Sequence, residues 1–96
     1  MAYFAVMRER GGPWDFSLTL REQEQWVEHA AFMEALVDGG FVVLGGPFAD
    51  GVRVLLIVDA ESETEIEARL AEDPWTPMGL LRTLSIERWE ILLGSR

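Results

Sequence analysis

The chain contains no cysteine and no lysine, and none of its apolar runs is long enough to cross a bilayer. The lack of cysteine excludes disulfides, thiolate metal ligands and a cysteine nucleophile. The longest apolar runs, such as residues 54–58, fall far short of the roughly 20 residues that a transmembrane helix needs. Because no basic region precedes an apolar run in the first residues, we expect no signal peptide and a cytoplasmic protein.

Positive charge is also scarce. The formal net charge is −9, and the eight basic residues are arginines scattered along the chain. Binding to nucleic acid requires basic side chains gathered on one face to neutralise phosphates, and binding to an anionic membrane surface requires a similar cluster. We therefore expect neither nucleic acid nor membrane among the partners, and we interpret the acidity as favouring solubility.

The 96 residues suffice for one domain, 1–96, and 49% of them are hydrophobic, which supports a core of modest size. Alternation and turn residues predict strands at residues 3–7, 41–44, 52–58 and 84–93. Capping boxes beginning at Thr19 and Ser62 predict helices from there to about Asp38 and Glu72. The loop from residue 10 to 18 is long for so small a domain and is a candidate pocket wall.

This element order, βαββαβ, is that of the ferredoxin-like α+β fold, in which two helices pack on one face of a four-stranded antiparallel sheet. The predicted strands are apolar on both faces, whereas a sheet with one wet face should alternate apolar with polar residues. Two helices cover one face only. We expect a second copy of the chain to cover the other face, which makes a homodimer. The alternative is that the long loop, with Trp14 and Phe16, folds over that face.

His29 is the only histidine, and on a helical wheel it lies within the apolar arc of the first predicted helix. Asp73 follows the inward side of the second helix. Each has an ordinary structural interpretation: a buried histidine bonded to a carbonyl, and an aspartate capping the turn at Pro74. Together, on adjacent elements, they also predict a histidine–carboxylate pair able to move a proton.

Other side chains add a possible pocket but no further chemistry. Gly46 and Pro47 follow the second strand and are expected to shape a pocket wall, and Trp75, beside Asp73, is expected to line it. The serines show no nucleophile elbow, which disfavours a serine triad. One histidine among scattered carboxylates gives no metal site, and we expect no cofactor.

The ordered set of His29, Gly46-Pro47, Asp73-Pro74 followed by an aromatic residue, and a closing strand ending near Trp89 resembles the YciI-like (YCII-related) proteins over nearly the whole chain. The resemblance implies a ferredoxin-like fold, dimeric α+β barrels, and an active site that falls on His29 and Asp73. Dehydrochlorination of a chlorinated hydroxyhydroquinone is found among relatives, which implies proton transfer on a small cyclic substrate. Some relatives carry an arginine three residues before the histidine, where this chain has Trp26. The candidates to replace it in binding an anionic substrate are Arg8 and Arg21.

Three hypotheses about function follow. In the first, His29 acts as general base or acid, oriented by Asp73, in a cofactor-free elimination or isomerisation of a small organic molecule, a lyase-type reaction. In the second, the same pocket holds a ligand without converting it, and the dimer is a binding or sensing module. In the third, the pair is only a buried polar contact in a structural dimer.

Overall fold

The computed structural model describes residues 2–94, and its elements alternate as the sequence predicts. The strands are β1 (Ala2–Arg10), β2 (Val42–Pro47), β3 (Arg53–Ala60) and β4 (Leu81–Arg88). The helices are the short 3₁₀ turn η1 (Leu20–Glu22), α1 (Trp26–Asp38) and α2 (Glu63–Leu70). None of the helices within residues 2–94 is long and apolar enough to span a membrane.

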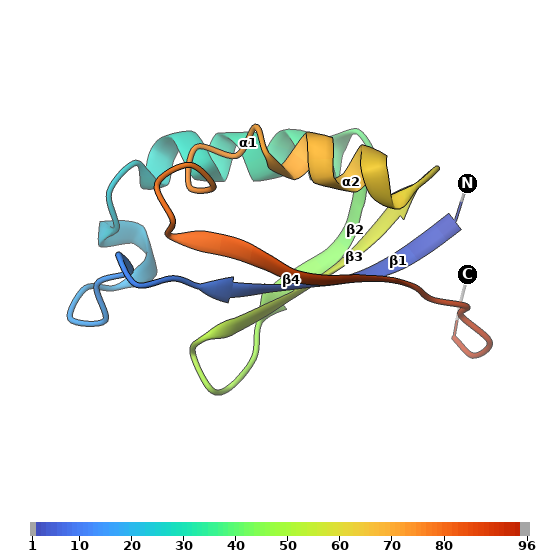
Figure 1. Ribbon diagram of the computed structural model, residues 1–96, viewed down its shortest axis with the longest axis horizontal. Coiled ribbons are helices and arrows are strands. Elements are labelled where there is room, and N and C mark those ends of the chain that lie inside the picture. The colour runs from blue at the N-terminus through green and yellow to red at the C-terminus, as the bar shows by residue number, and fades with distance from the viewer. Residues whose placement is uncertain (1, 95–96) are drawn as a thin grey trace.

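The four strands form one antiparallel sheet in the order β2-β3-β1-β4, and both α-helices lie on the same face of it (Figure 1). The predicted ferredoxin-like α+β fold is confirmed. β1 and β3 are the central strands, and their inward residues Phe4, Val6, Leu56 and Val58 are all buried. These side chains pack against Leu36 of α1 and Ile66 of α2, which makes the main core.

The predicted first helix is wrong at its start. Thr19 does open a turn, and its backbone N–H donates to Glu22 Oε1 at 2.8 Å, but this turn is η1 and ends at Glu22. The chain breaks at Gln25, whose φ of 59° and ψ of 31° are left-handed, and α1 begins only at Trp26. The break is held by the buried side chain of Gln23, whose amide donates to the carbonyl of Asp15 at 2.7 Å.

Two strand boundaries also differ from the prediction. Gly45-Gly46-Pro47 was expected to stop the second strand, yet β2 pairs with β3 through Pro47. Proline has no backbone N–H, and it is tolerated there because β2 is an edge strand whose outer side has no neighbouring strand to bond. The last strand starts at Leu81 rather than 84 and ends at Arg88, because β1 offers no partner beyond the bond from Trp89 N–H to the Tyr3 carbonyl.

The opposite face of the sheet carries no helix, and its residues follow from the register. Ile57 of β3 lies between Ala5 of β1 and Leu44 of β2, and Leu55 pairs with Met7. We call this surface the free face. Leu44 is 68% exposed, and the loop carrying Trp14 turns toward the helix side instead, where Trp14 is buried against Trp75. The alternative in which the long loop covers the free face is therefore wrong for Trp14.

Candidate active site

The structure brings His29 and Asp73 together. His29 lies on α1, and Asp73 lies three residues after the end of α2, where its backbone N–H donates to the carbonyl of Leu70 at 3.1 Å. His29 Nδ1 is 2.9 Å from Asp73 Oδ1 and 3.0 Å from Oδ2. The imidazole is almost buried, with 8% of the residue exposed, and the carboxylate is fully buried. The two helices thus place an imidazole and a carboxylate in contact, although 44 residues separate them.

Asp73 is held from three directions. Its Oδ1 accepts the backbone N–H of Trp75 at 2.9 Å, which is the local turn cap that an Asp-Pro sequence favours. Its Oδ2 accepts from Arg8 NH1 at 3.1 Å, a buried ion pair, and the histidine contacts both oxygens. The capping role and the pairing with histidine are therefore compatible, and one carboxylate serves both.

These contacts decide the charge of Asp73. Burial by itself raises the pKa of a carboxyl, but the hydrogen bonds from His29 and from Trp75 N–H, with the positive charges of His29 and Arg8, outweigh it. The pKa of Asp73 is consequently lower than its ordinary value of 3.8, and the group is ionised at neutral pH. An ionised carboxylate only accepts hydrogen bonds, so His29 Nδ1 carries the proton in this pair and Nε2 is left for other chemistry.

Trp75 fixes the imidazole from its flat side. The two rings are stacked, with centroids 3.7 Å apart and planes 8° from parallel. The indole is itself anchored, because its Nε1–H donates to the carbonyl of Glu24 at 2.6 Å. An aromatic face attracts a cation, so this stacking also stabilises an imidazolium formed when His29 takes up a proton.

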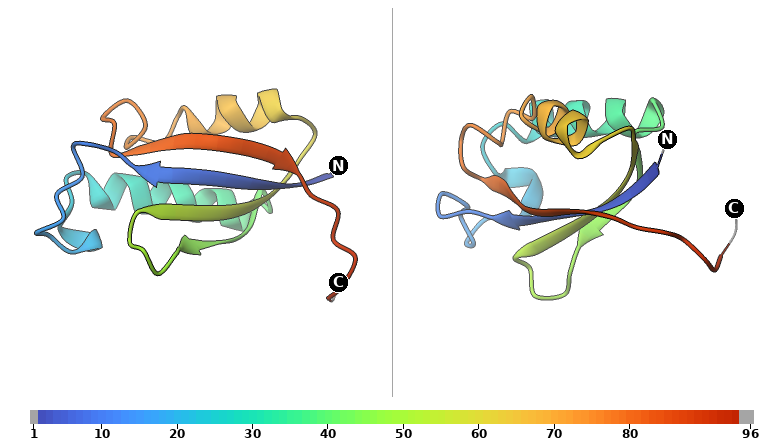
Figure 2. Two further views of the ribbon diagram at one scale, coloured as in Figure 1. Left: turned by 60° about the horizontal axis from the view of Figure 1, so that its bottom comes forward. Right: turned by 45° about the vertical axis from the view of Figure 1, so that its right-hand side comes forward.

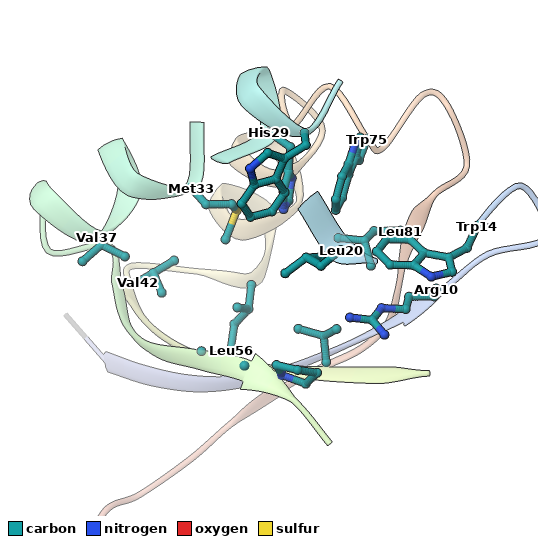
Figure 3. A pocket seen from close by; sticks show the side chains of 15 residues that line it. Arg10, Trp14, Leu20, His29, Met33, Val37, Val42, Leu56, Trp75 and Leu81 are labelled. Carbon is teal, nitrogen blue, oxygen red and sulfur yellow. The ribbon is translucent and has the colours of Figure 1, made fainter. Parts of the chain in front are cut away.

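A cavity of about 250 Å³ lies beside this pair, between α1, the sheet and the 10–18 loop (Figure 3). Its wall is mostly apolar, and His29 and Arg10 are the charged or titratable side chains among its lining residues. Gly45 belongs to the wall on β2, where an added Cβ would come within 2.7 Å of Leu56 Cδ2, so glycine keeps this side of the cavity open. The cavity has room for one small organic molecule in contact with the imidazole.

The other sequence candidates divide into two groups. Gly46, Pro47 and Trp75 line the cavity. Arg8 does not: it lies behind Asp73, 1% exposed, with NH2 donating to Thr76 Oγ1 at 2.9 Å. Arg21 lies 6.0 Å from the ring centre of Trp26 and is not part of the lining either.

Sequence reasoning missed Arg10 and did not assign Trp14 or Trp26 to the pocket, although all three line it. One signal was available for Arg10. Phe4, Val6, Arg8 and Arg10 follow one another at every second position, so they share the inward face of β1. Across residues 2–94, no three histidine or acidic side chains are grouped so as to hold a metal ion.

Comparison with solved structures shows which known protein this chain is similar to. A solved structure of 5-chloro-2-hydroxyhydroquinone dehydrochlorinase (TftG) from Burkholderia phenoliruptrix AC1100, in complex with 2,5-dihydroxybenzoquinone, is similar over 91% of this chain and 93% of its own, with 28% sequence identity and a TM-score of 0.65. The similarity supports a YciI-like fold for this chain. No family model and no curated protein sequence matches it.

Proposed function

We propose that the protein is a small-molecule enzyme in which His29 transfers a proton and Asp73 orients it. One observation carries the proposal: the Nδ1 of His29 is bound by an ionised, buried carboxylate, while the same ring forms part of the wall of a cavity. A histidine held in this way presents Nε2 to a bound molecule in a fixed tautomer, and the carboxylate stabilises the imidazolium that forms.

The chemistry is elimination or isomerisation. In elimination, Nε2 takes a proton from the substrate, the electron pair of the broken bond forms a double bond, and the leaving group departs with the electrons of its own bond. The imidazolium then releases its proton to solvent or to the leaving group. In isomerisation it returns the proton to another atom of the same molecule. Neither route changes the oxidation state of the protein, and both need only a base in a dry, shaped cavity.

The comparison supports the same class of reaction. The similar protein is named a dehydrochlorinase and was solved with a cyclic quinone, so a lyase-type elimination on a small ring compound is compatible with this fold. The apolar lining and the size of the cavity agree with a substrate of that kind. We extend this to the present chain as a substrate class, small cyclic hydroxy or keto compounds, and not as a particular molecule.

The test combines a compound panel with heavy water. Small cyclic hydroxy and keto compounds, 5-chloro-2-hydroxyhydroquinone among them, are incubated with the protein in D₂O and analysed by mass spectrometry. We expect elimination products or deuterium incorporation with the wild-type protein. We expect neither with His29→Gln, which keeps the size of the side chain but has no basic nitrogen. Conversion that survives in His29→Gln would show that the imidazole is not the base.

The same panel separates the second hypothesis. Panel compounds that bind to the protein and are recovered unchanged, without deuterium, would favour a binding or sensing module. The third hypothesis, a purely structural contact, needs His29 to have no cavity beside it, and the 250 Å³ cavity argues against that.

We also propose that the protein acts in the cytoplasm as a homodimer joined through the free face. The support is compositional: Leu44, 68% exposed, and Tyr3, 40% exposed, share that face with the half-buried Leu55, and no helix covers it (Figure 2). Leaving a few hundred Å² of apolar surface in water costs several kcal/mol at roughly 25 cal/mol per Å². A second copy, related by a two-fold axis, would cover this surface with its own.

A further inference from the structure

Arg10 occupies an unusual place for a guanidinium. Its side chain lines the cavity next to Trp14, whose ring centre is 4.3 Å from Arg10 Cζ (Figure 3). NH1 donates to the carbonyl of Gly51 at 2.6 Å, which fixes the direction of the group. The Nε atom is buried and has no hydrogen-bond partner within residues 2–94. The guanidinium is therefore positioned but not satisfied.

Carboxylates are abundant in this chain, yet none within residues 2–94 pairs with Arg10. Four other arginines each have a carboxylate oxygen within 4.0 Å: Arg8, Arg53, Arg69 and Arg82. Asp50 acts on Arg10 only at longer range, because its own oxygens accept from Arg53 and from the backbone N–H groups of Val52 and Arg53. Arg21 and Arg88 have no such partner within residues 2–94 either, but neither lines the cavity. Arg10 lines it and also has a buried Nε without a partner, so an anionic ligand in the cavity would pair with it.

The other residues that line the cavity favour a ligand of a particular shape. Trp14, Trp26 and Trp75 present aromatic surfaces to the cavity, and flat π surfaces favour a planar ring. An apolar cavity of about 150 Å³ already accepts benzene. The present 250 Å³ therefore holds a six-membered ring with substituents.

We propose that Arg10 is the residue that recognises the ligand, and that the ligand is a planar cyclic monoanion whose one ionised oxygen binds this guanidinium. This inference deepens the proposed function, on which it rests for the location of the site, by defining the substrate class. Within residues 2–94, Arg10 is the one permanently charged side chain that lines the cavity, and His29 must stay neutral to act as a base, so a dianion finds no second fixed cation and a neutral ring leaves the guanidinium unpaired. Charge on one oxygen is thus the property that the cavity selects.

The test compares two probes that differ in that charge. The binding of 4-nitrophenol, at a pH where it is fully ionised, and of its neutral methyl ether 4-nitroanisole is measured by isothermal titration calorimetry. A hydrogen bond to a charged group contributes enough for a roughly tenfold to hundredfold preference. We expect the wild-type protein to prefer the phenolate by that factor, and Arg10→Met to lose the preference while still binding the ether. Arg69→Met, which removes the same charge from α2, should keep the preference.

Several results would overturn the inference. Equal binding of the two probes by the wild-type protein would contradict it, and so would no binding of the phenolate at all. The same holds for a preference for the phenolate that persists in Arg10→Met, or for one that disappears in Arg69→Met. Should Arg10→Met fail to fold, the wild-type comparison still decides, and Arg10→Lys should retain a reduced preference for the phenolate.

The inference and the proposed function fail separately. His29→Gln is expected to abolish turnover yet keep the preference for the phenolate, since the guanidinium is unchanged. If no compound is ever converted but the preference depends on Arg10, the catalytic proposal is wrong and the ligand class stands. If compounds are converted but the protein shows no preference for the phenolate, the catalytic proposal stands and the proposed ligand class is wrong.

Discussion

At the scale of single residues, the site is organised around one buried carboxylate. Asp73 is fully buried and has contacts with Arg8, His29 and the backbone of Trp75. Burying a charge is costly unless it is paired and hydrogen-bonded, and these three partners meet that condition. Of the side chains that touch this carboxylate, those of Arg8 and His29, only the imidazole also lines the cavity.

The lowered pKa of Asp73 predicts how stability depends on pH. A carboxyl whose pKa is lower in the folded state stabilises the protein above its unfolded pKa, and this contribution is lost as the pH falls through the folded value. We expect the wild-type protein to lose stability below about pH 3.8. Asp73→Asn should be less stable by about 3 kcal/mol at neutral pH, because Arg8 loses its buried partner, and should decline less in acid. Urea unfolding between pH 7 and 3 measures both effects.

The control for this experiment is Glu72→Gln, which removes the same charge from the exposed position next to Asp73. Its stability should follow the wild-type curve. Parallel acid-dependent losses in the wild-type protein and in Asp73→Asn would mean that other carboxylates govern the transition.

Arg8 acts through Asp73 and not at the cavity wall. Replacing it with Met removes the positive charge behind the carboxylate, so the pKa of Asp73 should rise toward its unfolded value. The acid-induced loss of stability should then become smaller and be complete at a higher pH. Removal of one partner from a buried ion pair costs about 3–5 kcal/mol. Urea unfolding at several pH values measures the cost and the shift. Arg82→Met, at an exposed ion pair with Glu9, should change neither, and an unshifted acid transition in Arg8→Met would contradict the role given to Arg8.

At the scale of elements, the order and type of every long element follow from periodicity, because apolar alternation and capping residues are local signals. Ser62, for example, was expected to begin the second helix, and its Oγ accepts the backbone N–H of Glu65 at 3.1 Å. The boundaries that depend on tertiary contacts were not predictable in this way. Gln25 is an ordinary helix former, and only the buried contacts of Gln23 explain why the helix begins after it.

The candidate site shows the same division. The contact between His29 and Asp73 was predictable because His29 lies on the inward side of α1, Asp73 follows the inward side of α2, and neighbouring helices in this fold share one face. Arg8 was expected among the substrate-binding residues, whereas the structure places it behind Asp73 and places Arg10 at the wall. The first strand was predicted to end at residue 7, whereas β1 continues to Arg10. Only the structure shows that both arginines share its inward face and that the cavity lies at Arg10.

The left-handed Gln25 predicts a stabilising substitution. A non-glycine residue in this conformation costs roughly 1–2 kcal/mol, and glycine adopts it without a steric penalty. Part of the gain is offset by the greater entropy of glycine in the unfolded chain, so Gln25→Gly should stabilise by up to about 1 kcal/mol. Glu28→Gly, inside α1, should destabilise by about 1 kcal/mol. Thermal unfolding of both variants checks the opposite signs, and a destabilised Gln25→Gly would mean that the Gln25 side chain itself holds the junction.

At the scale of the whole molecule, the two faces of the sheet differ in how they are covered. The helix face is filled by the core and by the cavity, whereas the free face carries apolar residues of β1, β2 and β3, with the charged residues Glu9, Arg53 and Arg82 paired at one end of it. The segment after β4 extends beyond the sheet and exposes Leu92 and Leu93 almost fully (Figure 2). Apolar residues bordered by charged ones are the composition of an interface between protein chains.

A substitution on the free face tests the dimer. Stable interfaces bury about 800 Å² on each partner. Leu44 of the edge strand β2 is 68% exposed on this face, and a glutamate in its place would put a carboxylate against the apolar surface of the other copy. We expect sedimentation velocity to give a dimer for the wild-type protein and a folded monomer for Leu44→Glu. Val27→Glu, an equal change at the 73% exposed Val27 of α1, should remain dimeric, and a monomeric wild-type protein would end this proposal while leaving the chemistry of His29 untouched.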